Sequence, residues 1–144
     1  MIGSAVKVFI SHSSVDTWVA RQIGAQIRLR GATTFLDYDD VEHGDDFEDK
    51  IVDAATTCTE LLVLFTPWSR DRKYIWLEIG IFRAAKKRIV IALYGVKVND
   101  VSSDERIPSL LKKIDLVNLN DIDTYFSELS RRTNKSAGEE ARNA

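Results

Sequence analysis

The sequence has little of the residues that build several common kinds of site. Cys58 is the single cysteine among 144 residues, so no internal disulfide can form. The two histidines and this cysteine are far apart in the sequence, and we expect no bound metal ion. No apolar run approaches the roughly 20 residues that cross a bilayer, and residues 1–8 lack the pattern of a secretory signal. These absences predict a cytoplasmic protein with no membrane partner.

An excess of basic charge is missing as well. The formal net charge is −2, from 20 basic and 22 acidic side chains, which argues against direct binding of nucleic acid. Glycine is absent between Ile10 and Ile23, where a flavodoxin carries its phosphate loop, and no Rossmann or P-loop pattern occurs. With 44% apolar and 29% charged residues, the composition is that of an ordinary globular domain.

What the chain does contain is a regular alternation of apolar runs and helical periodicity. Strands are predicted at Val6–Ile10, Thr33–Leu36, Leu61–Phe65, Arg88–Leu93 and Ile114–Leu119. Helices are predicted at about Val15–Arg30, Asp45–Thr57, Tyr74–Ala85 and Asp121–Arg132, with an irregular connection over Val96–Arg106 and a short helix over Ile107–Lys113. This alternation predicts an α/β fold, a flavodoxin-like, doubly wound parallel sheet of five strands in the order 2-1-3-4-5.

Domain limits and local details follow from the same pattern. We predict one domain over residues 1–132 and a disordered polar tail over residues 133–144. The first helix is expected to place Val15, Val19, Ile23, Ile27 and Leu29 on or near one face. Ser13 and Asp16 have the spacing of a capping box at its start.

A candidate site follows from the topology. In such sheets ligands bind beyond the carboxyl ends of the strands, near the switch point between strands one and three. Three loops should meet there: Ser11–Ser14, Asp37–Asp45 and Thr66–Lys73. Glu78 follows the third loop in an otherwise apolar helix, where a charge is costly unless it is paired or used. Glu78 is therefore either a working group or a carboxylate that the helix dipole stabilises.

Taken in order, these segments resemble the Toll/interleukin-1 receptor (TIR) domains, and bacterial members in particular. The resemblance covers roughly residues 6–129 and is carried by Val8–Ser13, Phe35–Gly44, Phe47–Ile51 and Trp76–Gly80. It implies NAD⁺ glycohydrolase activity with an essential glutamate on the third helix, which is Glu78 here. The family's usual Trp-x-x-x-Glu pattern has Tyr74 in place of Trp, and the common Pro-Gly of its BB loop is His43-Gly44.

Further residues are carried over by the same resemblance. Glu42 matches an acidic position that contacts NAD⁺ in the animal axon-degeneration enzyme of the family. His12, Ser13 and Ser14 match a nucleotide-contacting stretch, although one of the two serines is equally expected to cap the first helix. Tyr74, Trp68 or His12 could stack on the nicotinamide ring. NAD⁺ is then the substrate and no cofactor is implied. Self-association through the Asp37–Asp45 loop is expected, and a sensor or effector chain is left open as a further partner.

Cleavage of the bond between nicotinamide and ribose is compatible with these candidate residues. Nicotinamide leaves the ribose as a neutral molecule, so one carboxylate that stabilises an oxocarbenium-like ribosyl cation is sufficient. The expected function is cleavage of NAD⁺ to nicotinamide and ADP-ribose or a cyclic ADP-ribose product, in bacterial antiviral immune signalling. A non-enzymatic TIR–TIR interaction module is the alternative, and a nucleoside deoxyribosyltransferase-like enzyme is a weaker one.

Overall fold

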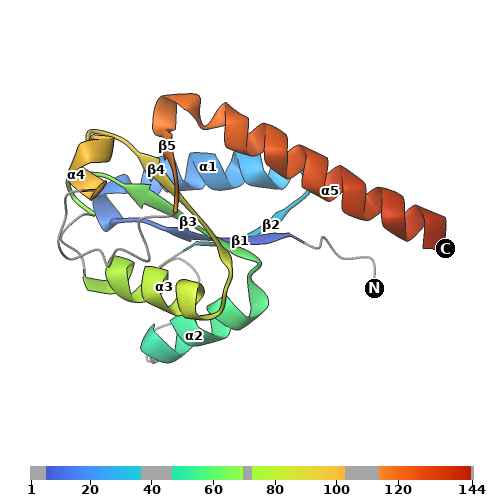
Figure 1. Ribbon diagram of the computed structural model, residues 1–144, viewed down its shortest axis with the longest axis horizontal. Coiled ribbons are helices and arrows are strands. Elements are labelled where there is room, and N and C mark those ends of the chain that lie inside the picture. The colour runs from blue at the N-terminus through green and yellow to red at the C-terminus, as the bar shows by residue number, and fades with distance from the viewer. Residues whose placement is uncertain (1–5, 37–46, 70–72, 103–113, 144) are drawn as a thin grey trace.

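The computed structural model describes residues 6–36, 47–69, 73–102 and 114–143. The strands are β1 (Lys7–Ser11), β2 (Thr33–Leu36), β3 (Glu60–Phe65), β4 (Arg88–Leu93) and β5 (Asp115–Asn118) (Figure 1). The helices are α1 (Thr17–Leu29), α2 (Phe47–Thr57), α3 (Lys73–Ala84), α4 (Val98–Ser102) and α5 (Asp123–Asn143), with 3-10 turns η1 (Ser14–Asp16) and η3 (Leu119–Asp121). Each strand lies within one residue of its predicted bounds.

The five strands form one sheet in the order β2-β1-β3-β4-β5, and every neighbouring pair is parallel. The predicted flavodoxin-like fold is thereby confirmed. β3 is buried along its whole length, because it lies at the centre of the sheet with helices over both faces. The edge strands β2 and β5 are only partly buried.

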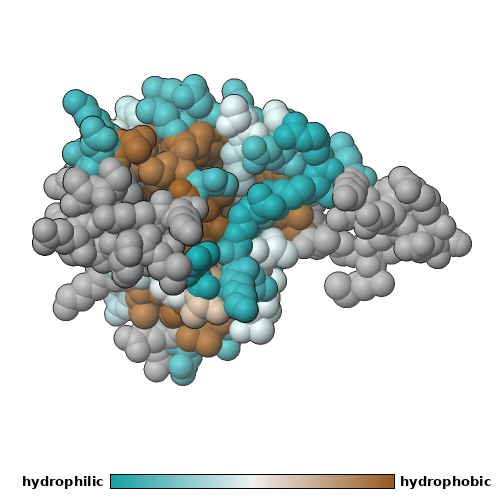
Figure 2. All heavy atoms as spheres, viewed as in Figure 1, coloured by the Kyte–Doolittle hydropathy of each residue, from teal (hydrophilic) through white to brown (hydrophobic). Residues whose placement is uncertain are grey.

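Two helical layers cover the sheet. Figure 1 shows α1 and α5 on one side and α2 and α3 on the other. Successive strand residues point to opposite faces, so Val8 and Ile10 join the core under α1 and α5, whereas Phe9 joins the core under α2 and α3. Figure 2 shows hydrophobic residues gathered at the upper left and at the bottom of this face, and hydrophilic residues along the coloured part of α5.

Two residues that were predicted on or near one face of the first helix do not share the buried face of α1. Ile23 and Ile27 are buried as expected, but Val15 and Leu29 are 66% and 76% exposed. Val15 belongs to η1, which precedes the helix and turns this side chain outward. Leu29 follows Ile27 by two residues, roughly 200° around the helix axis, and therefore points away from the sheet.

Two predicted boundaries also change. The segment Val96–Arg106, predicted as irregular, contains the short helix α4. The short helix predicted over Ile107–Lys113 lies outside the described residues. The closing helix α5 continues through residues 133–143, where a disordered tail was predicted, so the end of the domain at residue 132 is not marked by a break in secondary structure. Among the described helices, none is long and apolar enough to cross a membrane.

A buried carboxylate that the sequence did not point to fastens α5 to the sheet. Glu60 begins β3 and is fully buried. Tyr125 Oη donates a hydrogen bond to Glu60 Oε2 at 2.6 Å, and the guanidinium of Arg132 binds both carboxylate oxygens, with Nη2 at 3.0 Å from Oε2. Burial and the adjacent Glu60 raise the pKa of Tyr125, and the hydrogen bond to Glu60 raises the pKa of Arg132. These bonds hold α5 against the amino-terminal edge of β3.

Candidate active site

The carboxyl ends of β1 and β3 are neighbours, and the loops that follow them meet there. His12 and Ser13, which come directly after β1, are buried, whereas Ser14 is exposed. His12 Nδ1 lies 2.8 Å from the carbonyl oxygen of Ser13. The structure thus places two of the three predicted nucleotide-contacting side chains inside this edge of the sheet, and Ser14 on its surface.

Asp16 joins these two loops. Its Oδ2 atom accepts a hydrogen bond from Ser13 Oγ and another from Thr66 Oγ1, each at 2.6 Å. Thr66 directly follows β3, so one buried carboxylate fixes the β1 loop to the β3 loop. The sequence pattern suggested a capping box, but Ser13 donates to the Asp16 carboxylate and makes no side-chain cap hydrogen bond.

The turn after β3 is closed by a second buried hydroxyl. Ser69 Oγ accepts a hydrogen bond from the Thr66 backbone N–H at 2.7 Å and donates to the Leu64 carbonyl at 3.1 Å. Trp68, within this turn, is 56% exposed. The turn therefore presents an indole ring at the rim of the site, where an aromatic wall was predicted.

Glu78 lies on α3, beneath the sheet. The helix is anchored by two aromatic contacts: Trp76 against Phe65 at the end of β3, with ring centroids 5.8 Å apart, and Phe82 against Phe9 of β1, at 5.5 Å. Glu78 is one turn before Phe82 on the same helix face and is fully buried. Tyr74, one further turn toward the helix start, is 37% exposed. Tyr74, Glu78 and Phe82 thus form a stripe that leads from the rim into the core.

The structure describes most, but not all, of the residues that the sequence predicted for the site. His12, Ser13, Trp68, Tyr74 and Glu78 belong to elements that meet at the carboxyl edge of β1 and β3. Glu42 and the whole Asp37–Asp45 loop lie outside the described residues. Asp16 was missed as a member of this region. Its position three residues after Ser13 was read as a cap, and its second partner, Thr66, is 50 residues further along the chain.

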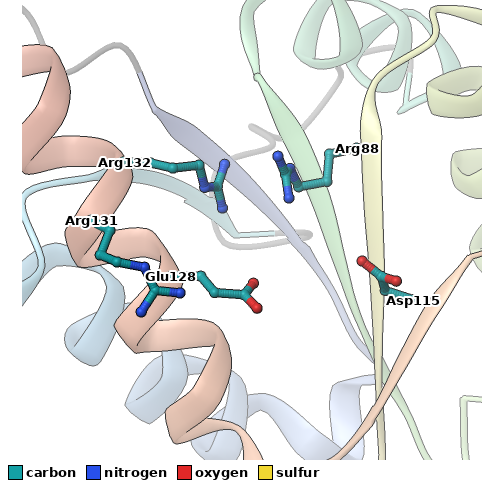
Figure 3. Close-up of a pocket in the computed structure, with 5 residues that line it drawn as sticks. All are labelled: Arg88, Asp115, Glu128, Arg131 and Arg132. Carbon is teal, nitrogen blue, oxygen red and sulfur yellow. The ribbon is translucent and has the colours of Figure 1, made fainter.

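A cavity of about 380 Å³ lies at the opposite edge of the sheet. Figure 3 shows Arg132 of α5 and Arg88 of β4 pointing toward one another, with Glu128 and Asp115 pointing into the same space. Arg88 and Asp115 are the first residues of β4 and β5, so this cavity is at the amino ends of the strands. Its mixed charges and its location separate it from the predicted site. Within the described ranges, no group of three or more His, Cys, Asp or Glu residues could hold a metal ion.

Comparison with known proteins points to one family. A family model described as "TIR domain" matches residues 8–131. A curated protein of Brachypodium distachyon, described as a probable 2′ cyclic ADP-D-ribose synthase, BdTIR, is 32% identical over 100 residues. That match covers 68% of this chain and 45% of the plant protein, so the chain spans less than half the length of this relative.

Solved structures share the fold. The TIR domain of the Toll-related receptor TRR-2 of Hydra magnipapillata superposes with a TM-score of 0.61 at 18% identity, over 94% of this chain and 97% of that one. A 2-desoxiribosyltransferase from Leishmania mexicana gives a TM-score of 0.64 at 11% identity, over 88% of this chain and 97% of that one. At such low identity these likenesses concern the fold alone.

Proposed function

Because this chain belongs to the TIR domain family, we propose that it cleaves the bond between nicotinamide and ribose in NAD⁺. The observation that carries the proposal is Glu78, a fully buried carboxylate on α3, one helical turn from the Phe82–Phe9 contact and close to the carboxyl edge of the sheet. The kinship with BdTIR, whose description names a cyclic ADP-ribose product, supports the same bond as the target. The products would be nicotinamide and ADP-ribose or a cyclic isomer of ADP-ribose.

Glu78 and Tyr74 of the stripe, and the predicted site residues of the neighbouring loops, each have a chemical role in this proposal. The Glu78 carboxylate stabilises positive charge at C1′ of the ribose while the neutral nicotinamide departs, either electrostatically or by forming a transient ester. The Tyr74 ring, at the rim, offers an apolar face against which the pyridinium can stack, and Trp68 offers a second one. His12 and Ser13 line the β1 loop and would contact the nucleotide. Glu42 would contact the substrate from the loop outside the described residues.

The burial of Glu78 adds a requirement. A fully buried carboxylate cannot meet C1′ until the side chains that cover it move. An assembly that favours the opened arrangement would raise the fraction of competent molecules by mass action. We therefore infer that activity depends on self-association, with the Asp37–Asp45 loop among the contacts. A role in immune signalling, antiviral in bacteria, would follow from such assembly-controlled NAD⁺ consumption.

The decisive experiment is nicotinamide release by Glu78→Gln. Glutamine keeps the shape of the side chain but removes the charge, so we expect a loss of about 10²–10³-fold or more in rate. Glu128→Gln is the matched control, because it neutralises an exposed carboxylate of α5 beside the cavity at the opposite edge of the sheet. All proteins are assayed with a crowding agent that promotes assembly, and thermal unfolding shows that the fold persists.

Two other functions make different forecasts. A TIR–TIR interaction module would release no nicotinamide from the wild type under assembling conditions, and Glu78→Gln would then assemble unchanged. The fold of the Leishmania 2-desoxiribosyltransferase motivates a further assay, transfer of deoxyribose between a nucleoside and a free base. Transfer of this kind with no action on NAD⁺ would favour that alternative. Equal nicotinamide release by wild type and Glu78→Gln would remove Glu78 from the mechanism.

A further inference from the structure

Ser11, the last residue of β1, faces α3. Side chains alternate along a strand, and Phe9, two residues earlier, packs in the core under α2 and α3. The neighbour of Ser11 in the sheet is Val63 of β3, which belongs to the same core. Adjacent residues of paired strands point to the same face, so both observations place the Ser11 hydroxyl on the side of the sheet that carries Glu78.

The Phe9–Phe82 contact shows which residue of α3 lies at the level of Ser11 on β1. The helix leaves β3 at the carboxyl edge of the sheet and returns the chain to β4 at the amino edge, so it runs antiparallel to the strands. From Phe9 to Ser11, the strand advances roughly 6.6 Å toward the carboxyl edge. From Phe82 back to Glu78, the helix retreats about 6 Å in the same direction. Ser11 and Glu78 are therefore opposite one another across the interface between β1 and α3.

The hydroxyl of Ser11 differs from the other buried hydroxyls of this edge. Ser13, Thr66 and Ser69 each form side-chain hydrogen bonds. Ser11 is fully buried, and its Oγ atom has no hydrogen-bond partner among the residues that the structure describes. A buried polar group without a partner lowers stability, and alanine would fill the same space without that cost. A serine at this position is best explained by a ligand that supplies the missing hydrogen bond.

We propose that Ser11 is a substrate-binding residue, whose hydroxyl hydrogen-bonds a ribose hydroxyl of the nicotinamide-bearing half of the substrate. The assignment rests on the proposed function and deepens it. A ribose carries two adjacent hydroxyls beside C1′, and a serine hydroxyl can donate to one or accept from it. With the Glu78 carboxylate opposite, the diol is held between the two side chains and C1′ is brought to the carboxylate. Ser11 thereby favours ribose ligands that keep the hydroxyl it binds.

The test compares two buried serines at the same edge of the sheet, Ser11→Ala and Ser69→Ala. Ser69 has its hydrogen bonds within the protein, so its loss should lower the Tm. Ser11→Ala should leave the Tm equal or raise it, and yet lower kcat/KM for NAD⁺ roughly tenfold, the effect of one lost hydrogen bond. Wild-type kcat/KM in Ser11→Ala, or a Tm lowered as in Ser69→Ala, overturns the assignment.

NAD⁺ analogues that lack one hydroxyl of the nicotinamide ribose show which of the two hydroxyls forms the hydrogen bond with Ser11. With the analogue that lacks the partner of Ser11, wild type and Ser11→Ala should perform alike. If Ser11→Ala reduces kcat/KM by the same factor for NAD⁺ and for both deoxy analogues, Ser11 does not contact the diol.

Equilibrium binding of ADP-ribose tests the role of Ser11 independently of NAD⁺ cleavage. If the wild type releases no nicotinamide under assembling conditions, the proposed function fails, and Ser11 is then judged by ADP-ribose affinity alone. Weaker binding by Ser11→Ala supports the assignment. Equal binding by both proteins, or no binding to the wild type, overturns it.

Discussion

Three acidic side chains, Asp16, Glu60 and Glu78, are buried in the described part of the protein, and each has a different setting. Asp16 accepts two hydroxyl hydrogen bonds and joins two loops at the carboxyl edge of the sheet. Glu60 is held by a guanidinium and a phenol at the amino edge. Glu78 is on the helix face that packs against β1. Burial of a carboxylate is costly in each case, and the hydrogen bonds to Asp16 and Glu60 offset that cost.

Asp16 should affect both stability and substrate binding. Asp16→Ala leaves the hydroxyls of Ser13 and Thr66 without their acceptor, so we expect a loss of about 1–3 kcal/mol in the free energy of unfolding. Asp16→Asn keeps one acceptor oxygen and should lose less. Because the β1 loop carries His12 and Ser13, Asp16→Asn should raise the KM for NAD⁺ more than it lowers kcat. Urea unfolding and steady-state kinetics test the two effects, and an unchanged KM in Asp16→Asn would limit Asp16 to a structural role.

At the level of elements, the strands and most helices follow from local pattern. The apolar run of β3 and the β-branched runs of β1 and β4 have the composition of buried parallel strands, and no local alternative competes. The short helix α4 was missed because five residues are too few for a helical period to be visible. The local sequence did contain one sign of this helix, the spacing of Lys97 and Asp100. In the structure Asp100 Oδ2 accepts a hydrogen bond from the Lys97 N–H at 2.9 Å, as in a capping box.

The candidate site was predicted as far as topology and family resemblance specify it. Glu78 was selected because a carboxylate in an apolar helix is anomalous and matches the family pattern, and its catalytic role stays a prediction. The Glu60 network could not be found, because Tyr125 and Arg132 follow Glu60 by 65 and 72 residues and no local pattern connects them. Ser11 was placed at the start of the loop after the first strand and given no role, since the sequence does not show that the hydroxyls of its neighbours are satisfied while its own is not.

The attachment of α5 can be tested through the Glu60 network. Tyr125→Phe removes one hydrogen bond and should cost about 1 kcal/mol of unfolding free energy. Arg132→Ala leaves the Glu60 carboxylate buried with Tyr125 as its remaining side-chain donor among the described residues. The Arg132 side chain is 26% exposed, so the loss should be below the about 3–5 kcal/mol typical of breaking a fully buried ion pair, but above that of Tyr125→Phe. Denaturant unfolding of the two variants and of Arg131→Ala, an exposed neighbour on α5, measures these differences.

A reverse order of these losses, or an equal loss in Arg131→Ala, would show that the network does not hold the helix. Nicotinamide release should be nearly unchanged in all three variants that remain folded. The reason is that the network is at the amino ends of the strands and the proposed site is at the carboxyl ends.

At the scale of the whole molecule, the two edges of the sheet differ in how they are built. At the amino edge, the Glu60 network attaches α5 to β3. The carboxyl edge carries Trp68 and Tyr74 in contact with solvent above the buried Glu78. Exposed aromatic side chains at the rim of a closed site are suited to contact either a ligand ring or a second protein chain. The burial of Glu78 and the exposure of these two rings are the observations that support the proposed dependence on assembly.

The proposed dependence on assembly predicts how specific activity changes with protein concentration. If a single chain keeps Glu78 covered and assembly favours the opened arrangement, nicotinamide released per mole of protein should rise with protein concentration and with a crowding agent. This rise is tested by measuring nicotinamide release over a dilution series while light scattering reports the size of the assemblies. Glu78→Gln is the control variant, which should assemble without turning over substrate. Activity should appear at the concentrations where species larger than the monomer appear. Constant specific activity over a wide dilution range, with only monomer in solution, would mean that the single chain opens its own site.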